Sequence, residues 1–304
     1  MTLTTSWAPS SHLQGGKVRE TTPHDRSALA ALAHFAPYAH QNPGWAAPLS
    51  RLGSPGFVAH EAADGQVDAA LAVLPETERV AWVRLFAATL SPPTLAWEAL
   101  WPQSLASLAR VSRPHWVAAM PFTDWFRELL AAAGFAHAGY VDVLAWMSHP
   151  LPEPQQRADL RLRAMTSSDL PAVSAVDAAA FGEFWRLAPD ALRMALARSV
   201  WATVITEPTT GRVLGFQIST PSPLGGHLAR LAVHPDAQGR GLGRWLVQDA
   251  LRFFRRNGAE RVTLSTQGDN ATALALYRRL GFHLTEERYP VYRYDLSAEA
   301  ASDG

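Results

Sequence analysis

Apolar and polar residues alternate in short, regular stretches along the second half of the chain and predict a mixed α/β protein. Six stretches rich in β-branched and apolar residues predict strands. They lie at 159–164, 201–206, 212–219, 227–234, 261–266 and 290–296. Helices are expected between them, and Glu207-Pro-Thr-Thr-Gly211 predicts the hairpin turn between the second strand and the third.

One of the expected helices, 241–256, has a clear apolar face. Leu242, Trp245, Leu246, Ala250 and Phe253 recur on one side of it, with Gln248, Arg252, Arg255 and Arg256 on the other. Asn257-Gly258 is expected to end this helix, which should cover one face of the sheet.

Three glycines alternate strictly at the start of this helix, at Gly239, Gly241 and Gly243. Glycine permits left-handed backbone and close approach of a ligand, and the first amides of a helix have no partner within it. The pattern therefore predicts a pyrophosphate cradle and a phosphorylated cofactor. Its spacing fits neither the dinucleotide turn nor the P-loop, because Arg244 is followed by Trp245. Tight packing alone is the structural alternative.

A second motif runs from Asn270 to Phe282, after an alternating apolar strand. Asn270 is expected to cap a helix and Gly281 to end it. Ala273, Leu276, Tyr277 and Leu280 recur at helical spacing. Tyr277 is thus expected beside the apolar stripe, with its hydroxyl facing a cleft; an ordinary core tyrosine is the alternative.

Together the two motifs resemble those of the GNAT acetyltransferases, which bind acetyl-CoA. The resemblance implies that the fourth strand of the fold splays from the fifth, so that the free amides of Leu231 and Val233 bind pantetheine and the thioester carbonyl. It implies that Tyr277 protonates the departing thiolate. The implied cofactor contacts are Leu231, Ala232, Val233, Gln238, Gly239, Arg240, Gly241, Leu242, Gly243, Arg244, Asn270, Ala273 and Tyr277.

The general base is not identified by the motifs. Members of the family that modify ribosomal proteins carry a glutamate twelve residues before the tyrosine, where this chain has Ser265. Glu183, His227, His234 and an ordered water are the remaining candidates.

Short segments recur at a nearly constant displacement and predict two copies of one fold. Residues 18–25 parallel 162–169, Arg84-Leu85 parallels Arg230-Leu231, and residues 130–135 parallel 277–282. The first copy has Pro92-Pro93 in the region of the glycines and Leu130 at the position of Tyr277. It is therefore expected to be degenerate, and its tryptophans are expected to serve packing rather than a substrate groove.

The expected fold is thus two tandem GNAT folds, each a mixed, mostly antiparallel central sheet flanked by helices. The predicted limits are a disordered tail over 1–17, the degenerate domain over 18–147 and a linker over 148–158. The catalytic domain follows over 159–297, and residues 298–304 form a tail. The prolines of 148–156 cannot continue a helix or a central strand, which favours a linker there.

Composition narrows the possible partners. The 304 residues allow two domains, and a formal net charge of zero gives no reason to expect nucleic acid or an anionic membrane. The absence of cysteine excludes a cysteinyl acetyl-enzyme, and the dispersed histidines suggest no metal. With no long apolar run or signal-like start, a cytoplasmic protein is expected, either monomer or homodimer.

The favoured function is acetyl-CoA-dependent transfer of an acetyl group directly to a primary amine, on a small molecule or a peptide amino terminus. A non-catalytic acyl-CoA sensor is one alternative. Another is a small-molecule acetyltransferase similar to mycothiol synthase, which the tandem arrangement resembles. A scaffold of two inactive copies is disfavoured by the intact glycines.

Overall fold

The computed structural model describes residues 16–42, 44–148, 151 and 157–296. Within the chain two compact units form: residues up to 137 together with those from 291 onward (unit 1), and residues 138–290 (unit 2). The predicted tails and most of the predicted linker lie outside the described residues, although Lys17 already belongs to the first strand. No helix of the described ranges is long and apolar enough to cross a membrane.

Unit 1 has its sheet in the order β1-β3-β4-β5-β6-β13, antiparallel except for the β5/β6 pair. Its elements are β1 (Lys17–Glu20), α1 (Arg26–Phe35), β2 (Tyr38–Gln41), β3 (Phe57–Glu61), β4 (Val67–Pro75), β5 (Val80–Ala88), α2 (Pro93–Leu108), β6 (Trp116–Ala119) and α3 (Asp124–Ala132). Helix α1 packs on one face of the sheet, while α2 and α3 pack on the other.

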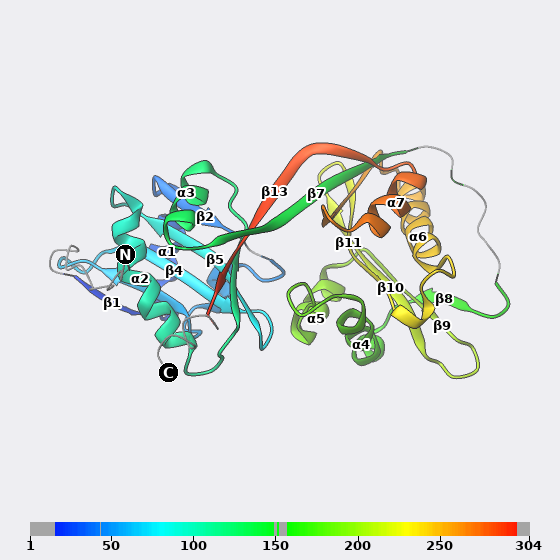
Figure 1. The fold of residues 1–304 in the computed structure, drawn as a ribbon, viewed down its shortest axis with the longest axis horizontal. Coiled ribbons are helices and arrows are strands. Elements are labelled where there is room, and N and C mark those ends of the chain that lie inside the picture. Colours follow the sequence, from blue (N-terminus) through cyan, green and yellow to red (C-terminus); the bar gives the residue numbers. More distant parts are fainter. Residues whose placement is uncertain (1–15, 43, 149–150, 152–156, 297–304) are drawn as a thin grey trace, which may run out of the picture. The chain divides into compact units, whose positions relative to one another are not determined.

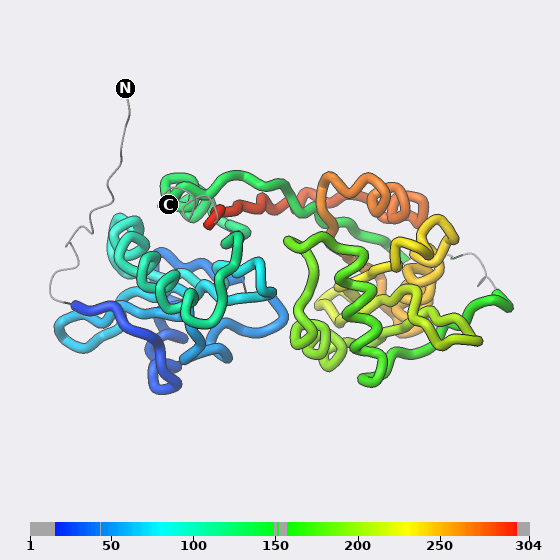
Figure 2. Tube along the Cα trace, turned by 60° about the horizontal axis from the view of Figure 1, so that its bottom comes forward, coloured from blue at the N-terminus to red at the C-terminus, as the bar shows by residue number. Residues whose placement is uncertain are grey.

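Unit 2 repeats this arrangement with the order β8-β9-β10-β11-β12-β7, again with one parallel pair, β11/β12. Its elements are β8 (Arg161–Ala164), α4 (Leu170–Ala180), α5 (Pro189–Arg198), β9 (Trp201–Thr206), β10 (Val213–Ser222), β11 (Gly225–Val233), α6 (Leu242–Arg256), β12 (Arg261–Gln267) and α7 (Ala271–Arg279). Helices α4 and α5 cover one face of its sheet, and α6 and α7 the other (Figures 1 and 2).

The last strand of each sheet comes from the other copy. Strand β7 (Ala136–Met147) follows α3, yet its residues 141–147 pair with β12 in unit 2. Strand β13 (His283–Asp295) follows α7, yet its residues 292–295 pair with β6 in unit 1. The two long strands are neighbours and can be followed in Figure 1. The boundaries between the compact units therefore lie at 137/138 and 290/291, whereas the domain limits predicted from the sequence lie at 147, 159 and 297.

The predicted elements of unit 2 agree closely with the structure. Five of the six strands both begin and end within three residues of the predicted limits, and the hairpin turn forms, with Glu207 N–H donating to the Arg212 carbonyl at 3.0 Å. Strand β13 begins at His283 rather than at 290, because it pairs first with β7 and only then with β6. The prediction for Gln248 was wrong: it is buried at 3% exposure rather than on the solvent face of α6.

Matching local contacts confirm that the two units are copies. In both, a threonine and an aspartate form a capping box, and an arginine donates two hydrogen bonds to that aspartate. The distances are 2.9 and 2.7 Å from Arg19 to Asp25, and 2.8 and 2.7 Å from Arg163 to Asp169. Helices α3 and α7 also end alike, each with a glycine of positive φ, Gly134 and Gly281.

A β-bulge gives the register between the copies. Ala229 is skipped in the pairing of β10 with β11, and Arg84 is skipped in the pairing of β4 with β5. Arg230 therefore corresponds to Leu85. The sequence match of Arg84-Leu85 with Arg230-Leu231 was one residue out of register, because a bulge residue is invisible to a two-residue match.

Aromatic residues in the first half of the chain mainly fill cores. Trp82, Trp97 and Trp101 in unit 1 are at most 7% exposed, and Trp146, on β7, is fully buried in unit 2. The rings of Trp97 and Trp101 stack with centroids 5.1 Å apart. Packing was the expected role for these side chains.

Candidate active site

Strands β11 and β12 separate part-way along their length. They pair in parallel from Gly225 opposite Arg261 to Leu228 opposite Leu264, and the bulge at Ala229 follows directly. Strand β11 then continues to Val233 beside β10 alone, as far as the described pairings show. The stretch from Ala229 to Val233 thus has an edge that β12 leaves, which we call the open edge.

The direction of the backbone groups at the open edge follows from one hydrogen bond. His234 N–H donates to the Leu214 carbonyl at 2.8 Å, toward β10. Because successive residues of a strand alternate, the amides of Leu231 and Val233 point the other way, to the open edge. The Val233 carbonyl accepts from Gln238 Nε2 at 3.1 Å on that side. These are the two amides that the resemblance assigns to the cofactor.

The glycine turn, residues 239–243, follows β11 and runs into the first residues of α6. Gly239 and Gly241 have φ of +74° and +79°, and a Cβ built on either would meet no atom within 4 Å. Glycine is needed at both positions for its backbone conformation, and the space beside them is free for a ligand. Gly243 differs, since a Cβ there would lie 3.2 Å from Leu276 Cδ2 on α7. It permits close packing of the two helices.

The start of α6 fits a pyrophosphate. The amides of Leu242, Gly243 and Arg244 belong to the first turn, where helix amides have no partner within the helix. No acidic residue lies in this turn to oppose an anion. The backbone just before this turn is held in place at Arg240, because Arg157 Nη1 donates to the Arg240 carbonyl at 2.8 Å. Arg240 also lies 3.5 Å from Asp159.

Tyr277 lies on α7, whose start is fixed by Asn270. The Asn270 Oδ1 accepts the Ala273 N–H at 3.0 Å, which confirms the predicted cap and leaves the amide nitrogen of Asn270 for other contacts. Tyr277 is only 7% exposed, and this burial raises the pKa of its phenol to about 12, while the positive charge of Arg230 acts in the opposite direction. The phenol is therefore protonated at neutral pH and available as a proton donor.

Of the candidate bases, His227 has the most favourable setting. It precedes Leu228, the last residue of β11 that pairs with β12, and burial lowers its pKa. Its Nδ1 lies 2.9 Å from the Thr263 hydroxyl, which in turn reaches the Gly226 carbonyl at 3.5 Å. If that hydroxyl donates to the carbonyl, it accepts from Nδ1–H, and Nε2 keeps its lone pair.

The other candidates are placed differently. His234 follows β11 and accepts the Asp236 N–H at 3.3 Å through Nδ1, so it supports the turn that leads to the glycines. Glu183 is exposed in the segment after α4, and Ser265 is exposed on β12.

Comparison with known proteins identifies this arrangement. Residues 170–282, which contain β11, the glycine turn, α6, β12 and α7, match the model of the acetyltransferase (GNAT) family. The match to the GNAT family thus covers the residues of the candidate site and less than half of the chain. Over 152 residues the chain is 38% identical to a mycothiol acetyltransferase of Saccharomonospora viridis, and this match covers 44% of this chain and 49% of that protein. A mycothiol acetyltransferase of Rhodococcus jostii is 35% identical over 157 residues, covering 43% and 48%.

The chain spans about half the length of these curated relatives. Solved structures show the fold over a greater length. A tandem GNAT protein from the clavulanic acid biosynthesis pathway matches 92% of this chain and 98% of its own with a TM-score of 0.60 and 18% identity. A GCN5-related N-acetyltransferase from Sphaerobacter thermophilus matches 92% and 95% with a TM-score of 0.59 and 19% identity. The tandem GNAT fold is thus shown for both units.

The same edge is closed in the first GNAT unit. Strands β5 and β6 pair only from Val80 to Trp82, but β2 pairs with the continuation of β5 from Leu85 to Ala88. Since β4 occupies the other edge of these residues, β2 lies on the edge that β6 leaves. Asn42 N–H donates to the Arg84 carbonyl at 2.9 Å, so Phe86 and Ala88 also face β2. They correspond to Leu231 and Val233.

Aromatic side chains fill the space beside this closed edge. The ring of His40 on β2 stacks on Phe126 at 4.0 Å, and Phe86 lies edge-on to Trp97 at 5.4 Å. His40 is buried with no hydrogen-bond partner at Nε2, and this burial lowers its pKa to about 3. Leu130 occupies the position of Tyr277, and Phe135 N–H donates to its carbonyl as Phe282 N–H does to that of Tyr277.

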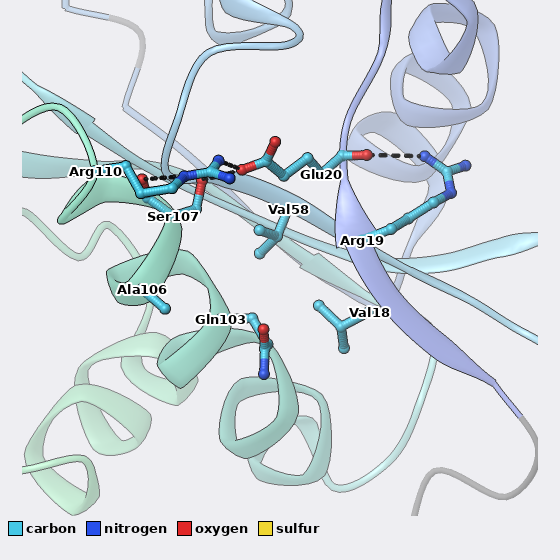
Figure 3. Close-up of a pocket in the computed structure, with 8 residues that line it drawn as sticks. All are labelled: Val18, Arg19, Glu20, Val58, Gln103, Ala106, Ser107 and Arg110. Carbon is cyan, nitrogen blue, oxygen red and sulfur yellow. Dashed lines mark hydrogen bonds and ion pairs between the residues drawn. The ribbon is translucent and has the colours of Figure 1, made fainter.

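A hollow of about 340 Å³ in unit 1 lies elsewhere, between β1 and α2. Figure 3 shows the guanidinium of Arg110 and the hydroxyl of Ser107 directed at the carboxylate of Glu20. Val18, Arg19, Val58, Gln103 and Ala106 complete its lining. The carboxylate is neutralised by Arg110, and the hollow is separate from the edge that corresponds to the open edge of unit 2.

Sequence reasoning missed an ion pair at the site, between Arg230 on β11 and Asp177 on α4. Asp177 lies beside Val176 in an apolar helix and is fully buried. An acidic residue on the apolar face of a helix requires a charged partner, and this is the signal that could have indicated the pair.

Proposed function

We propose that this protein is an acetyl-CoA-dependent N-acetyltransferase, whose unit 2 transfers an acetyl group directly to the primary amine of a small molecule. The observation that carries the proposal is the open edge of β11, which is followed, after one short turn, by the glycine turn and the start of α6. Backbone donors along this path suit an extended pantetheine followed by a pyrophosphate.

The residues of the chain divide the work of the reaction. Acetyl-CoA, when bound, supplies the activated thioester. The first-turn amides of α6 hold its phosphates, while the amides of Leu231 and Val233 hold the extended arm and face the negative charge that develops on the carbonyl oxygen. Tyr277, neutral because burial raises its pKa to about 12, donates its proton to the departing thiolate sulfur.

His227 is the base that we favour for the amine. Its lowered pKa keeps the imidazole neutral at pH 7, and Thr263 can hold the Nδ1 hydrogen so that Nε2 takes the proton from the attacking amine. His227 and Arg230 lie on the sheet face of α4 and α5, opposite the α6 face to which Leu228 contributes. The amine would then enter from the α4 side.

A small molecule is favoured over a peptide amino terminus as the acceptor. The curated relatives are named mycothiol acetyltransferases, which supports a related small thiol precursor with a primary amine. Ser265 also replaces the glutamate of members that modify ribosomal proteins. Because the reaction uses acetyl-CoA, we place it in the cytoplasm.

Release of free CoA from acetyl-CoA tests the proposal. The purified protein is assayed with a thiol reagent in the presence of glucosamine, S-methylcysteine or trialanine, which represent amino sugars, amino acids and peptide termini. Acceleration by one of the first two is the expected result. Acceleration by trialanine alone would favour a peptide acceptor, and tight CoA binding without any amine-dependent release across a broad amine panel would favour a sensor.

A further inference from the structure

Asp177 and Arg230 form a buried, two-point ion pair that joins α4 to β11. Arg230 Nε donates to Asp177 Oδ1 at 2.7 Å, and Nη2 donates to Oδ2 at 2.8 Å. The two side chains are 1% and 12% exposed. Planar two-point pairing of this kind fixes orientation as well as distance.

Both partners also hold the segment Phe181–Ala188 between α4 and α5, which we call the α4–α5 loop. Arg230 Nη2 donates to the Trp185 carbonyl at 2.9 Å, and Leu187 N–H donates to Asp177 Oδ2 at 2.8 Å. The guanidinium carbon lies 3.5 Å from the centroid of the Phe181 ring. The pair thus anchors the loop at three points.

The anchoring point is next to the proposed reacting groups. Arg230 lies between the bulge residue Ala229 and Leu231, whose amide faces the open edge. Its charge is near enough to Tyr277 to act on that phenol. The loop presents Phe184 and Trp185, both half-buried, with their rings 5.1 Å apart.

Unit 1 lacks both members of the pair. Arg230 corresponds to Leu85, and Asp177 corresponds to Ala33 through the shared capping boxes. The segment after α1 in unit 1 instead forms β2 and pairs with β5. The ion pair is therefore found only in the unit that carries the tyrosine.

A buried ion pair is weak evidence for stability, because well-packed apolar residues often serve equally well. Its geometry calls for another explanation.

We propose that Arg230 and Asp177 are positioning residues that hold the α4–α5 loop as one wall of the acceptor site, so that acceptor binding depends on the pair and cofactor binding does not. The proposal rests on the proposed function for the existence of an acceptor. The anchoring of the loop itself does not, and it can be tested without any acceptor.

Backbone hydrogen exchange measures the anchoring directly. Arg230→Lys and Asp177→Asn each remove the two-point pairing while keeping a polar side chain of similar size. The matched control is Arg163→Lys, which weakens an equivalent two-point pair to Asp169 in the same unit. Amides of residues 182–188 are expected to exchange at least about tenfold faster in the first two variants and unchanged in the control. Unchanged exchange there, or an equal increase over all of unit 2, would overturn the proposal.

Acetyl-CoA binding and kinetics separate positioning from general damage. Calorimetry with acetyl-CoA alone should give a Kd within about twofold of the unmodified protein in all three variants. With whichever of the three amines is turned over, Arg230→Lys and Asp177→Asn should raise the KM for the amine about tenfold or more and change kcat less. Loss of acetyl-CoA binding in step with the amine would contradict the inference. If no amine is turned over, the proposed function is in question while the exchange result still decides on the loop.

Discussion

At the scale of single residues, the site contains two groups whose protonation is set by burial. The pKa of Tyr277 is raised to about 12, and that of His227 is lowered. Both shifts favour the neutral form, which suits the proposed roles of Tyr277 as proton donor and His227 as proton acceptor.

Tyr277→Phe is expected to lower kcat and kcat/KM together, by about 10² to 10⁴, because the proposed mechanism uses its proton in the transition state. The Kd for acetyl-CoA should stay within about twofold. Tyr289→Phe is the control, since it removes a tyrosine hydroxyl that donates a hydrogen bond to Glu287 on β13. Equal kcat in the unmodified protein and Tyr277→Phe, with chemistry rate-limiting, would exclude the phenol as the acid.

His227→Asn keeps a donor for Thr263 but has no group that can take a proton near pH 7. We expect a loss of about 10² or more in kcat. In the unmodified protein the neutral imidazole is lost as pH falls through its pKa, which lies below 6.5, so activity should fall there. This acid limb should be absent from the pH profile of His227→Asn. A profile of the same shape in both proteins would assign the base to water or to another residue.

At the scale of elements, the two copies differ in what lies on the edge of the central strand. In unit 2 the edge of β11 leads into the glycine turn, and in unit 1 the edge of β5 is paired with β2. A strand pairing supplied by the chain itself replaces donors that a ligand would otherwise use.

One CoA per chain is therefore expected in calorimetry. Gly241→Asp should weaken that binding at least about tenfold, because the carboxylate would lie at the start of α6 where the phosphates are expected. Gly211→Asp is a close control: φ is +72° there, no atom lies within 4 Å of a built Cβ, and the residue is in the β9–β10 turn. Two equivalent sites, or equal weakening by both substitutions, would contradict the assignment.

His40 makes β2 sensitive to acid. Its pKa is lowered from 6.5 to about 3, so the folded state favours the neutral ring, and this contribution is complete above pH 6.5 and is lost as pH falls toward 3. The free energy of unfolding should fall by up to about 1.4 kcal/mol per pH unit between pH 6.5 and 4. His40→Phe should flatten this dependence, whereas His34→Gln, at an exposed position of α1, should not. Denaturant titrations across this range decide; parallel curves would refute the assignment.

At the scale of the whole molecule, the exchange of β7 and β13 decides which pieces can fold. Residues 138–290 contain every strand that pairs in unit 2. Residues 151–304 lack β7, so that β12 loses its antiparallel partner from Arg261 to Gln267.

We expect the 138–290 fragment to unfold cooperatively and to bind acetyl-CoA. The 151–304 fragment should be far less stable or should aggregate, because an unpaired strand with buried apolar residues becomes a free edge. Thermal unfolding and calorimetry of the two fragments make the comparison. Equal stability of both would show that β7 contributes little to unit 2.

The sequence predicts those features that are encoded within one short segment. The glycine turn, the Asn270 cap and Tyr277 each follow from local spacing, and so does the repeat. The exchange of β7 and β13, the closure by β2 and the choice of Arg230 as the partner of Asp177 could not be predicted in this way. Each joins residues far apart in the chain, where a pairing energy rather than a local preference selects the partner. The bulge at Ala229 illustrates the limit, since it shifts a match by one residue without any trace in composition.

The exchange of the last strands also bears on the order in which the chain folds during synthesis. Strand β6 of unit 1 leaves the ribosome early, but its partner β13 follows only after all of unit 2. At roughly 5–20 residues per second, the interval between residues 137 and 291 lasts on the order of 10 to 30 seconds. All residues of unit 2 are thus synthesised before the last strand of unit 1. Unit 2 can complete its sheet first, while β6 of unit 1, which contains Val117 and Ala119, still lacks its partner strand β13.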